Sequence, residues 1–203
     1  MNSNLTLVQL ISEQPMPNLL PILRLRPKRL IHITTPKTRS QSDHLLRAAH
    51  AAGIKPEIEL VQLSDMPGIS EVFEEVNQLL IQMNEADESC VVNFTGGTKL
   101  MSIGAYAAAL TQKVPSLYVD GADARFVDGN TSSKMRELFD DDWSFASISN
   151  QLQVHILGIA HGTERITRGR NWQVFLPLSQ YLFENRDDEE CMHQALVGQN
   201  GVI

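Results

Sequence analysis

The sequence is poor in cysteine, carries no excess of basic residues and contains no long hydrophobic run. Its two cysteines, Cys90 and Cys191, lie far apart, so neither a disulfide framework nor the ligand spacing of a zinc site is present. The net charge of −7 argues against a protein that coats duplex nucleic acid with a broadly basic surface. It leaves room for a small anionic ligand, because a pocket needs only local positive potential.

Targeting signals are also lacking. No segment is long and apolar enough to span a bilayer. The first residues have neither the basic region nor the uninterrupted apolar run of a secretory signal. We therefore expect a cytoplasmic globular protein of 203 residues. We expect it neither to contact a membrane nor, in this part of the protein, to bind duplex DNA directly.

Strand and helix patterns alternate through roughly the first 125 residues. The apolar patterning predicts strands over 5–12, 29–35, 57–63, 89–95 and 116–121. It predicts helices over 18–25, 42–53, 70–83 and 98–112, with Asn18 and Ser42 as N-caps and Gly53 as a stop. A hairpin that turns at 128–130 is expected next. This alternation is typical of an α/β fold with a Rossmann-like, doubly wound, mostly parallel sheet.

The loops that follow the strands are the expected ligand site, because open α/β sheets bind ligands at the carboxyl ends of their strands. The loops in question cover 13–18, 34–38 and 95–99. The last of them, Thr-Gly-Gly-Thr-Lys, stands between a strand and a helix. Gly96 and Gly97 allow backbone amides to approach a ligand, the helix start adds positive potential, and Lys99 adds a charge. Together these features predict an anion or phosphate cradle.

A second interpretation of this loop stays open. Its glycines also suit a tight turn that only brings helix and strand close together. The loop lacks the spacing of a Walker P-loop and of the dinucleotide-binding fingerprint, so taken alone it is weak evidence for a phosphate site.

The three loops in this order resemble the CARF domains, the CRISPR-associated Rossmann-fold sensors that are fused to nucleases or other effectors in type III CRISPR systems. The similarity runs over residues 4–125 and includes "SEQPMPN", "TTPKT" and "NFTGGTKLM". It implies a homodimer that binds a cyclic oligoadenylate across its two-fold axis and thereby switches on an attached effector by an allosteric change. Some CARF domains also cleave their ligand slowly.

The resemblance divides the chain into a CARF ligand-sensing domain over 1–142 and a small helical extension over 143–203. The extension has helical patterns over 148–162 and 172–185. We interpret it as a helical module or as a linker to an effector domain that this chain lacks. A run of carboxylates over 140–142 fits a solvated turn better than a metal site.

The predicted ligand-binding residues fall into four groups. The glycine loop supplies ribose-phosphate contacts, the loop after the second strand supplies a second polar wall, and the loop after the first strand supplies the adenine or ribose edge. One methionine packs under the ligand. The glycine-loop group is Gly96, Gly97, Thr98 and Lys99, with Thr95 in support. The loop after the second strand supplies Thr34, Thr35 and Lys37, and the loop after the first strand supplies Gln14, Met16 and Asn18. The methionine is Met101. Alternatives stay open for three of these residues. Lys37 and Lys99 can be ordinary surface lysines, and Met101 can be a core residue.

No catalytic residue, metal ligand or cofactor is predicted. The histidines show no metal spacing, and none lies in the three loops to act as a base. Cyclic tetra-adenylate is the favoured ligand, although no motif encodes the ring size. The alternatives are a ring nuclease that cleaves the ligand by positioning it, and a transcription regulator whose C-terminal helices contact DNA through Arg165, Arg168 and Arg170.

Overall fold

One six-stranded sheet forms the framework of the computed structural model, which describes residues 5–86, 88–120, 123–127, 156 and 159–162. Its strands are β1 (Thr6–Leu10), β2 (Arg29–Thr34), β3 (Glu57–Gln62), β4 (Cys90–Asn93), β5 (Ser116–Asp120) and β6 (Asp123–Val127). They lie in the order β3-β2-β1-β4-β5-β6, in which β1 to β5 are parallel and β6 is antiparallel to β5. The predicted Rossmann-like, mostly parallel sheet is confirmed.

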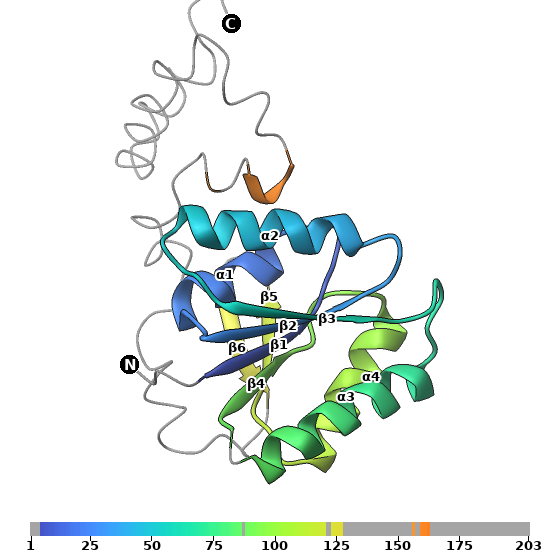
Figure 1. The fold of residues 1–203 in the computed structure, drawn as a ribbon. Coiled ribbons are helices and arrows are strands. Elements are labelled where there is room, and N and C mark those ends of the chain that lie inside the picture. Colours follow the sequence, from blue (N-terminus) through green and yellow to red (C-terminus); the bar gives the residue numbers. More distant parts are fainter. Residues whose placement is uncertain (1–4, 87, 121–122, 128–155, 157–158, 163–203) are drawn as a thin grey trace, which may run out of the picture. The chain divides into compact units, whose positions relative to one another are not determined.

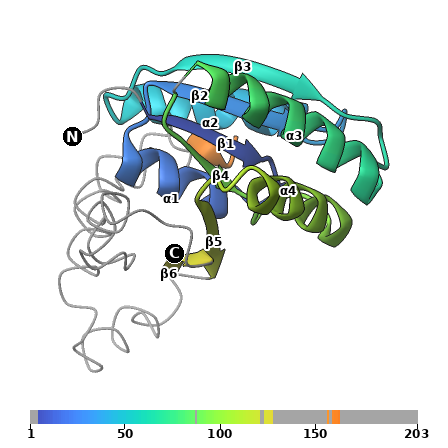
Figure 2. The same ribbon diagram turned by 90° about the horizontal axis from the view of Figure 1, so that it is seen from below.

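The helices cover both faces of this sheet. Helices α1 (Met16–Leu25) and α2 (Arg39–Ala51) lie on one face, and α3 (Ile69–Glu85) and α4 (Lys99–Thr111) lie side by side on the other (Figure 1, Figure 2). This division follows from the strand order, since right-handed crossovers that move outward from β1 in opposite directions place their helices on opposite faces. None of the helices in the described ranges has the length and hydropathy needed to cross a bilayer.

Alternating residues of the central strands build the two halves of the core. Leu7 pairs in register with Leu30 and Val91, and all three are buried under α1 and α2. The next row is Val8 with Ile31 and Val92, which is buried under α3 and α4. Because both faces are covered, these strands are apolar on both sides, as parallel strands require.

Two predicted helix starts are wrong. Helix α1 begins at Met16, because Pro17 suits the first turn, where its missing N–H costs nothing; Asn18 therefore lies inside the helix and is not the cap. Helix α2 begins at Arg39 after Thr38, which places Ser42 in the helix interior. The predicted stop of α2 is confirmed, since Gly53 follows the helix with φ +73°.

The chain after β5 also differs from the predicted pattern. Residues 123–127 form β6 and return along β5, from Ser116 paired with Val127 to Asp120 paired with Asp123. A hairpin therefore forms one step earlier in the chain than predicted, because 123–127 pair with the edge of β5 that β4 leaves open. The predicted turn at 128–130 lies outside the described residues.

The chain divides into two compact units, Met1–Gly162 and Thr163–Ile203. Ile156 and Ala160 are fully buried and belong to the core under α1 and α2, and Gln41 Nε2 donates to the Ala160 carbonyl at 2.6 Å. The segment 159–162 is therefore attached to α2. The predicted boundary after residue 142, the carboxylates 140–142, the arginines 165, 168 and 170, and the predicted helix over 172–185 lie outside the described residues.

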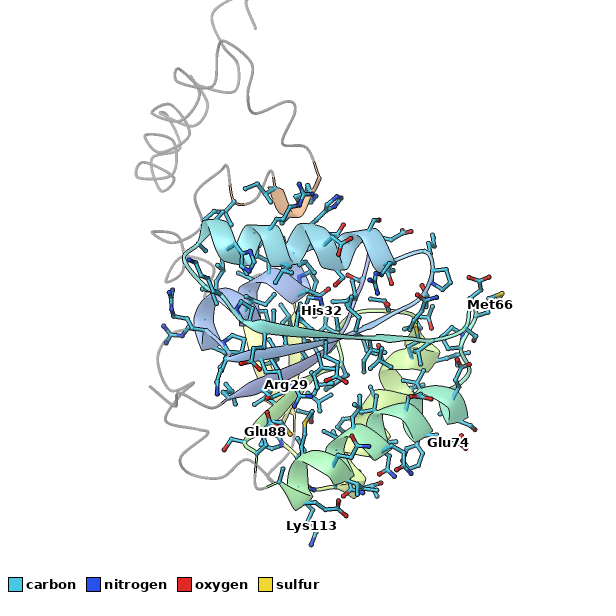
Figure 3. All side chains as sticks on the ribbon, viewed as in Figure 1. Arg29, His32, Met66, Glu74, Glu88 and Lys113 are labelled. Atoms are coloured by element: carbon cyan, nitrogen blue, oxygen red, sulfur yellow. The ribbon has the colours of Figure 1, made fainter. Side chains whose placement is uncertain are left out.

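The amino ends of the strands carry a cluster of charged side chains. Arg29 contacts Glu59 and also Glu88, the latter at 3.1 Å (Figure 3). These carboxylates raise the pKa of Arg29, with the hydrogen bond that Arg29 donates to Glu59 as the largest cause. All three side chains are partly exposed, so each pair stabilises the fold only weakly. The charged cluster marks the edge of the sheet opposite to the one described below.

The contact between α3 and α4 depends on Gly104. A Cβ atom on Gly104 would lie 2.6 Å from the Ile69 carbonyl oxygen and 2.9 Å from Val72 Cβ. We predict that Gly104→Ala lowers the free energy of unfolding by about 1–3 kcal/mol, since overpacking outweighs the higher helix propensity of alanine. Urea unfolding measures this. Gly68→Ala is the control, because the space around Gly68 is open. An unchanged free energy of unfolding in Gly104→Ala would contradict the close packing of the two helices.

Candidate functional site

A pocket of about 710 Å³ opens at the carboxyl edge of the sheet. Every parallel strand contributes to it through its following loop or its last residues. The lining residues are Ile11, Ser12, Glu13, Gln14, Met16, Pro17, Thr35, Lys37, Thr38, Asp65, Pro67, Thr95, Gly97, Thr98, Met101, Tyr118 and Val119. Its size is within the range of small-molecule sites.

The pocket lies at the topological switch point of the sheet. β1 and β4 are neighbours, yet β1 leads to α1 on one face and β4 leads to α4 on the other. The loops after these strands therefore diverge and leave a crevice between them. The position of the pocket is a consequence of strand order and does not depend on any single side chain.

Glycine is needed at the two positions after β4 for different physical reasons. A Cβ atom on Gly96 would collide with the Leu10 carbonyl, so Gly96 allows the turn to approach the end of β1. Gly97 has φ +75°, a backbone conformation that favours glycine, and it lines the pocket. The packing interpretation therefore accounts for Gly96, whereas Gly97 faces the site.

Thr98 starts α4 at the pocket. Its Oγ1 accepts a hydrogen bond from Met101 N at 3.3 Å, and the Met101 sulfur lies 3.4 Å from Thr98 N. Met101 is 1% exposed, as a core residue is, and it also contributes to the pocket wall. Its packing under a ligand stays a prediction. The predicted helix start at Thr98 is confirmed.

The positive potential of the pocket comes mainly from the backbone. Helices α1, α2 and α4 all begin with residues that line it, so the positive ends of their dipoles converge there. The charged lining side chains are Lys37, Glu13 and Asp65. Lys37 Nζ lies 2.7 Å from Glu13 Oε1, and both side chains are well exposed. Such a pair is weak, so an anionic ligand can displace Glu13 from Lys37.

Most of the predicted site residues line this pocket: Gln14, Met16, Thr35, Lys37, Thr95, Gly97, Thr98 and Met101. The others lie beside or beneath it. Asn18 and Thr34 are buried, and Thr34 Oγ1 donates to the Val61 carbonyl at 3.3 Å. Gly96 packs against Leu10, and Lys99 is exposed at the first position of α4. Contact of any of these residues with a ligand stays a prediction.

The loop after β3 was missed at the sequence level. Asp65 and Pro67 line the pocket, and Ser64 fixes this loop by donating from its N and its Oγ to the Glu71 carboxylate at 2.8 and 2.7 Å. Met66, between the two lining residues, is 91% exposed (Figure 3). The rule that selected the other loops would have found this one, since β3 is parallel to them and ends at the same edge.

An aromatic row borders the pocket. Tyr118 lines it and is 41% exposed, Phe94 lies 5.6 Å from Tyr118, and Tyr106 lies 5.1 Å from Phe94 between ring centroids. A partly exposed tyrosine supported from behind is a suitable surface for a planar base to stack on.

A row of buried polar side chains crosses the sheet between the apolar core and the pocket. Gln9 is paired in register with His32 of β2 and Asn93 of β4. All three lie on the face that α1 and α2 cover, and Figure 3 labels His32. These three residues, here called the polar row, have no exposed surface. Sequence patterning did not identify them as a group, because the partners come from strands that are far apart in the chain.

The hydrogen bonds of the polar row have a definite direction. Burial lowers the pKa of His32 from 6.5 to about 3, so the imidazole is neutral and has one donor and one acceptor nitrogen. The amide nitrogens of Asn18 and Asn93 face Gln9 Oε1 at 3.3 and 3.4 Å, which orients the Gln9 amide. Gln9 Nε2 then donates to His32 Nε2 at 2.9 Å, and His32 Nδ1 donates to Ser42 Oγ at 2.7 Å.

The polar row continues into the pocket walls. Asn93 Oδ1 accepts from Thr95 N at 3.1 Å and from Thr95 Oγ1 at 2.7 Å, and Thr95 Oγ1 accepts from Val119 N at 2.8 Å. Asn18 Oδ1 accepts from Ser12 N at 3.2 Å. The proton of the Thr95 hydroxyl is thus already used, which fits the supporting role predicted for this residue.

A family model described as the Card1 CARF domain matches residues 6–140. No curated protein matches the chain.

Solved structures with the same fold include several larger proteins. Can2 from Sulfobacillus thermosulfidooxidans, in complex with cyclic tetra-adenylate, is 24% identical with a TM-score of 0.54, over 63% of this chain and 36% of that one. Protein VC1899 from Vibrio cholerae is 15% identical with a TM-score of 0.57, over 65% and 35%. A type III CRISPR defence DNA nuclease activated by cyclic oligoadenylate is 22% identical with a TM-score of 0.52, over 60% and 19%. The chain therefore spans little more than a third of these proteins at most.

The neutral, buried His32 makes stability depend on pH. In the unfolded chain the imidazole binds a proton below pH 6.5, whereas in the folded protein it stays neutral down to about pH 3. Its contribution is complete above pH 6.5 and is lost as the pH falls from 6.5 toward 3, by about 1.4 kcal/mol per pH unit.

Urea unfolding at pH 7.5 and pH 5.0 checks this expectation. We predict a smaller difference in unfolding free energy between the two pH values for His32→Gln than for the wild type. The other histidines cancel in the comparison. Equal pH dependence of the two proteins would show that His32 is not buried in the neutral form.

Proposed function

Because the chain belongs to the CARF domain family, we propose that it is the sensor of a type III CRISPR defence system and binds a cyclic oligoadenylate, with cyclic tetra-adenylate favoured. The observation that carries this proposal is the pocket at the switch point, where the glycine loop and the starts of three helices meet. The Can2 structure, which is a complex with cyclic tetra-adenylate and shares this fold over 36% of its chain, supports the choice of ligand.

The chemistry of the pocket suits a ring of RNA. Phosphates are attracted to Gly97, Thr98 and the first amides of α4, where the helix dipole and the unpaired N–H groups act together. Lys37 offers a positive charge to a phosphate that replaces Glu13 as its partner. Tyr118 offers a face for an adenine, supported by Phe94.

We further propose that two copies of the chain share one ring. A tetranucleotide ring is larger than the drug-sized ligands that a pocket of about 710 Å³ usually encloses, so a single subunit covers only part of it. Beside the pocket, α4 exposes Leu100, Ile103 and Leu110 on one face, each about half exposed. A second copy related by a two-fold axis would cover this apolar face and complete the site.

Helix α2 supplies a physical link between ligand and output. It begins at Thr38 in the pocket wall, and its Gln41 side chain holds the Ala160 carbonyl, close to the end of the first unit at Gly162. A ligand that shifts the start of α2 would act on this segment. We propose that an effector is controlled by this route, with no catalytic residue assigned to the sensor itself.

Titration calorimetry with cyclic tetra-adenylate, cyclic hexa-adenylate and linear tetra-adenylate tests the proposal. We expect micromolar or tighter binding of a ring with one ring per two chains, and weaker binding of the linear form, which loses conformational freedom on binding. Heat from neither ring at micromolar protein would reject the proposed function.

The Glu13–Lys37 pair yields a test with opposite signs. We predict that Lys37→Ala raises the Kd for the ring about 5- to 20-fold, because it removes a cation from the lining. Glu13→Gln should lower the Kd by about 2- to 5-fold, because it removes a like charge and releases Lys37. Both effects should shrink at high salt.

The matched controls are Lys55→Ala and Glu57→Gln, which make the same charge changes at exposed positions by the amino end of β3. They should leave the Kd within about twofold of the wild type at physiological salt, where charges beyond about 8 Å are screened. If the control variants change affinity as much as the pocket variants, net charge rather than this pocket governs binding.

A further inference from the structure

We propose that His32 is a positioning residue for the pocket, one that holds the loops after β1 and β4 and the start of α2 in a fixed mutual arrangement. The inference that this arrangement matters for a ring of RNA depends on the proposed function, whereas the arrangement itself does not. His32 lies within β2, is fully buried, and has no contact with the pocket.

The polar row connects His32 to several elements that border the pocket. Through Gln9, His32 is joined to Asn18, which holds Ser12 N, and to Asn93, which holds Thr95. On its other side His32 is joined to Ser42, one turn into α2. The loops after β1 and β4 therefore meet at the Gln9 side chain, and the His32 imidazole connects this junction to α2.

The hydrogen bonds of this set run in one consistent direction. Asn93 Nδ2 donates to the Pro17 carbonyl at 2.8 Å as well as to Gln9, and Asn18 Nδ2 donates to the Leu10 carbonyl at 2.7 Å as well as to Gln9. A neutral imidazole is needed to accept from Gln9 and donate to Ser42 at the same time. A residue that offers only one of these functions leaves a buried polar group unpaired.

Stability alone does not require polar residues in this layer of the sheet. The neighbouring row on the same face of the sheet is Leu30, Leu7 and Val91, which is fully apolar and fully buried. A well-packed apolar row is at least as stabilising as a buried polar one. The polar row occupies only the layer that adjoins the pocket, where hydrogen bonds give direction that apolar contacts do not.

The experiment compares His32→Leu, His32→Gln and Ser42→Ala with the wild type. His32→Leu removes both hydrogen bonds. His32→Gln keeps an acceptor for Gln9, and Ser42→Ala removes only the partner of Nδ1. The control is Val76→Ala. It creates a cavity in the half of the core under α3 and α4, on the other face of the sheet from the polar row. It lowers stability without changing any of these hydrogen bonds.

The direct readout is amide hydrogen exchange in the ligand-free protein. We expect the amides of Ser12, Thr95 and Val119 to exchange about tenfold faster in His32→Leu, and less so in His32→Gln and Ser42→Ala. In Val76→Ala the acceleration should follow global stability and should not select these amides. Acceleration spread evenly over the sheet in the His32 variants would mean that His32 only fills space and would overturn the inference.

The second readout is affinity for cyclic tetra-adenylate, compared at equal fractions of folded protein. We expect a Kd about 5- to 20-fold higher in His32→Leu, partial recovery in His32→Gln, and no change in Val76→Ala. If His32→Leu does not fold, Ser42→Ala decides, with an expected rise of about 2- to 3-fold. An unchanged Kd in the folded variants overturns the inference. Absence of binding by the wild type rejects the proposed function instead, and hydrogen exchange alone then decides.

Discussion

The parallel pairing of β1 with β4 is the constraint on which the rest of this structure depends. These strands are adjacent in the sheet but lead to helices on opposite faces, and this divergence creates the pocket. Gly96 makes the pairing compatible with a tight turn, because any side chain at this position would collide with the Leu10 carbonyl. The loops after β1 and β4, the start of α4 and the end of the polar row all follow from this central pair.

The net charge of the chain is a poor guide to its ligand. The protein carries −7, and the charged side chains of the pocket include both Glu13 and Asp65. Three helix starts nevertheless meet there, and each contributes up to about 1–2 kcal/mol for a partly buried anion. The exposed Lys37–Glu13 pair contributes about 0–1 kcal/mol. For the proposed phosphate ligand, the backbone amides and helix dipoles therefore contribute more attraction than the Lys37–Glu13 pair does.

Much of the fold was predictable because it depends on local patterns. Apolar runs located the strands, and Gly53 and Thr98 marked a helix end and a helix start correctly. The start of α1 was misplaced because Asn18 is a good cap in isolation, whereas in the protein its amide is used by Leu10, Ser12 and Gln9. A rule about local sequence cannot take such distant partners into account.

The same distinction applies to the candidate site. The glycine loop was recognisable because its residues are contiguous, and Thr98 and Gly97 do line the pocket. The polar row was not, because Gln9, His32 and Asn93 become neighbours only through strand register. His32 in particular looks like an ordinary residue within a strand until its partners are known. Register is set by tertiary packing, which a single sequence does not display.

A crystal structure of the protein with cyclic tetra-adenylate tests the central claim most directly, namely that the crevice between the β1 and β4 loops holds the ring. The account predicts a ring on a two-fold axis between two chains, with phosphates at Gly97 and Thr98 and an adenine against Tyr118. A ring bound away from these loops, or a crevice filled by the protein's own side chains in the presence of saturating ligand, would contradict it.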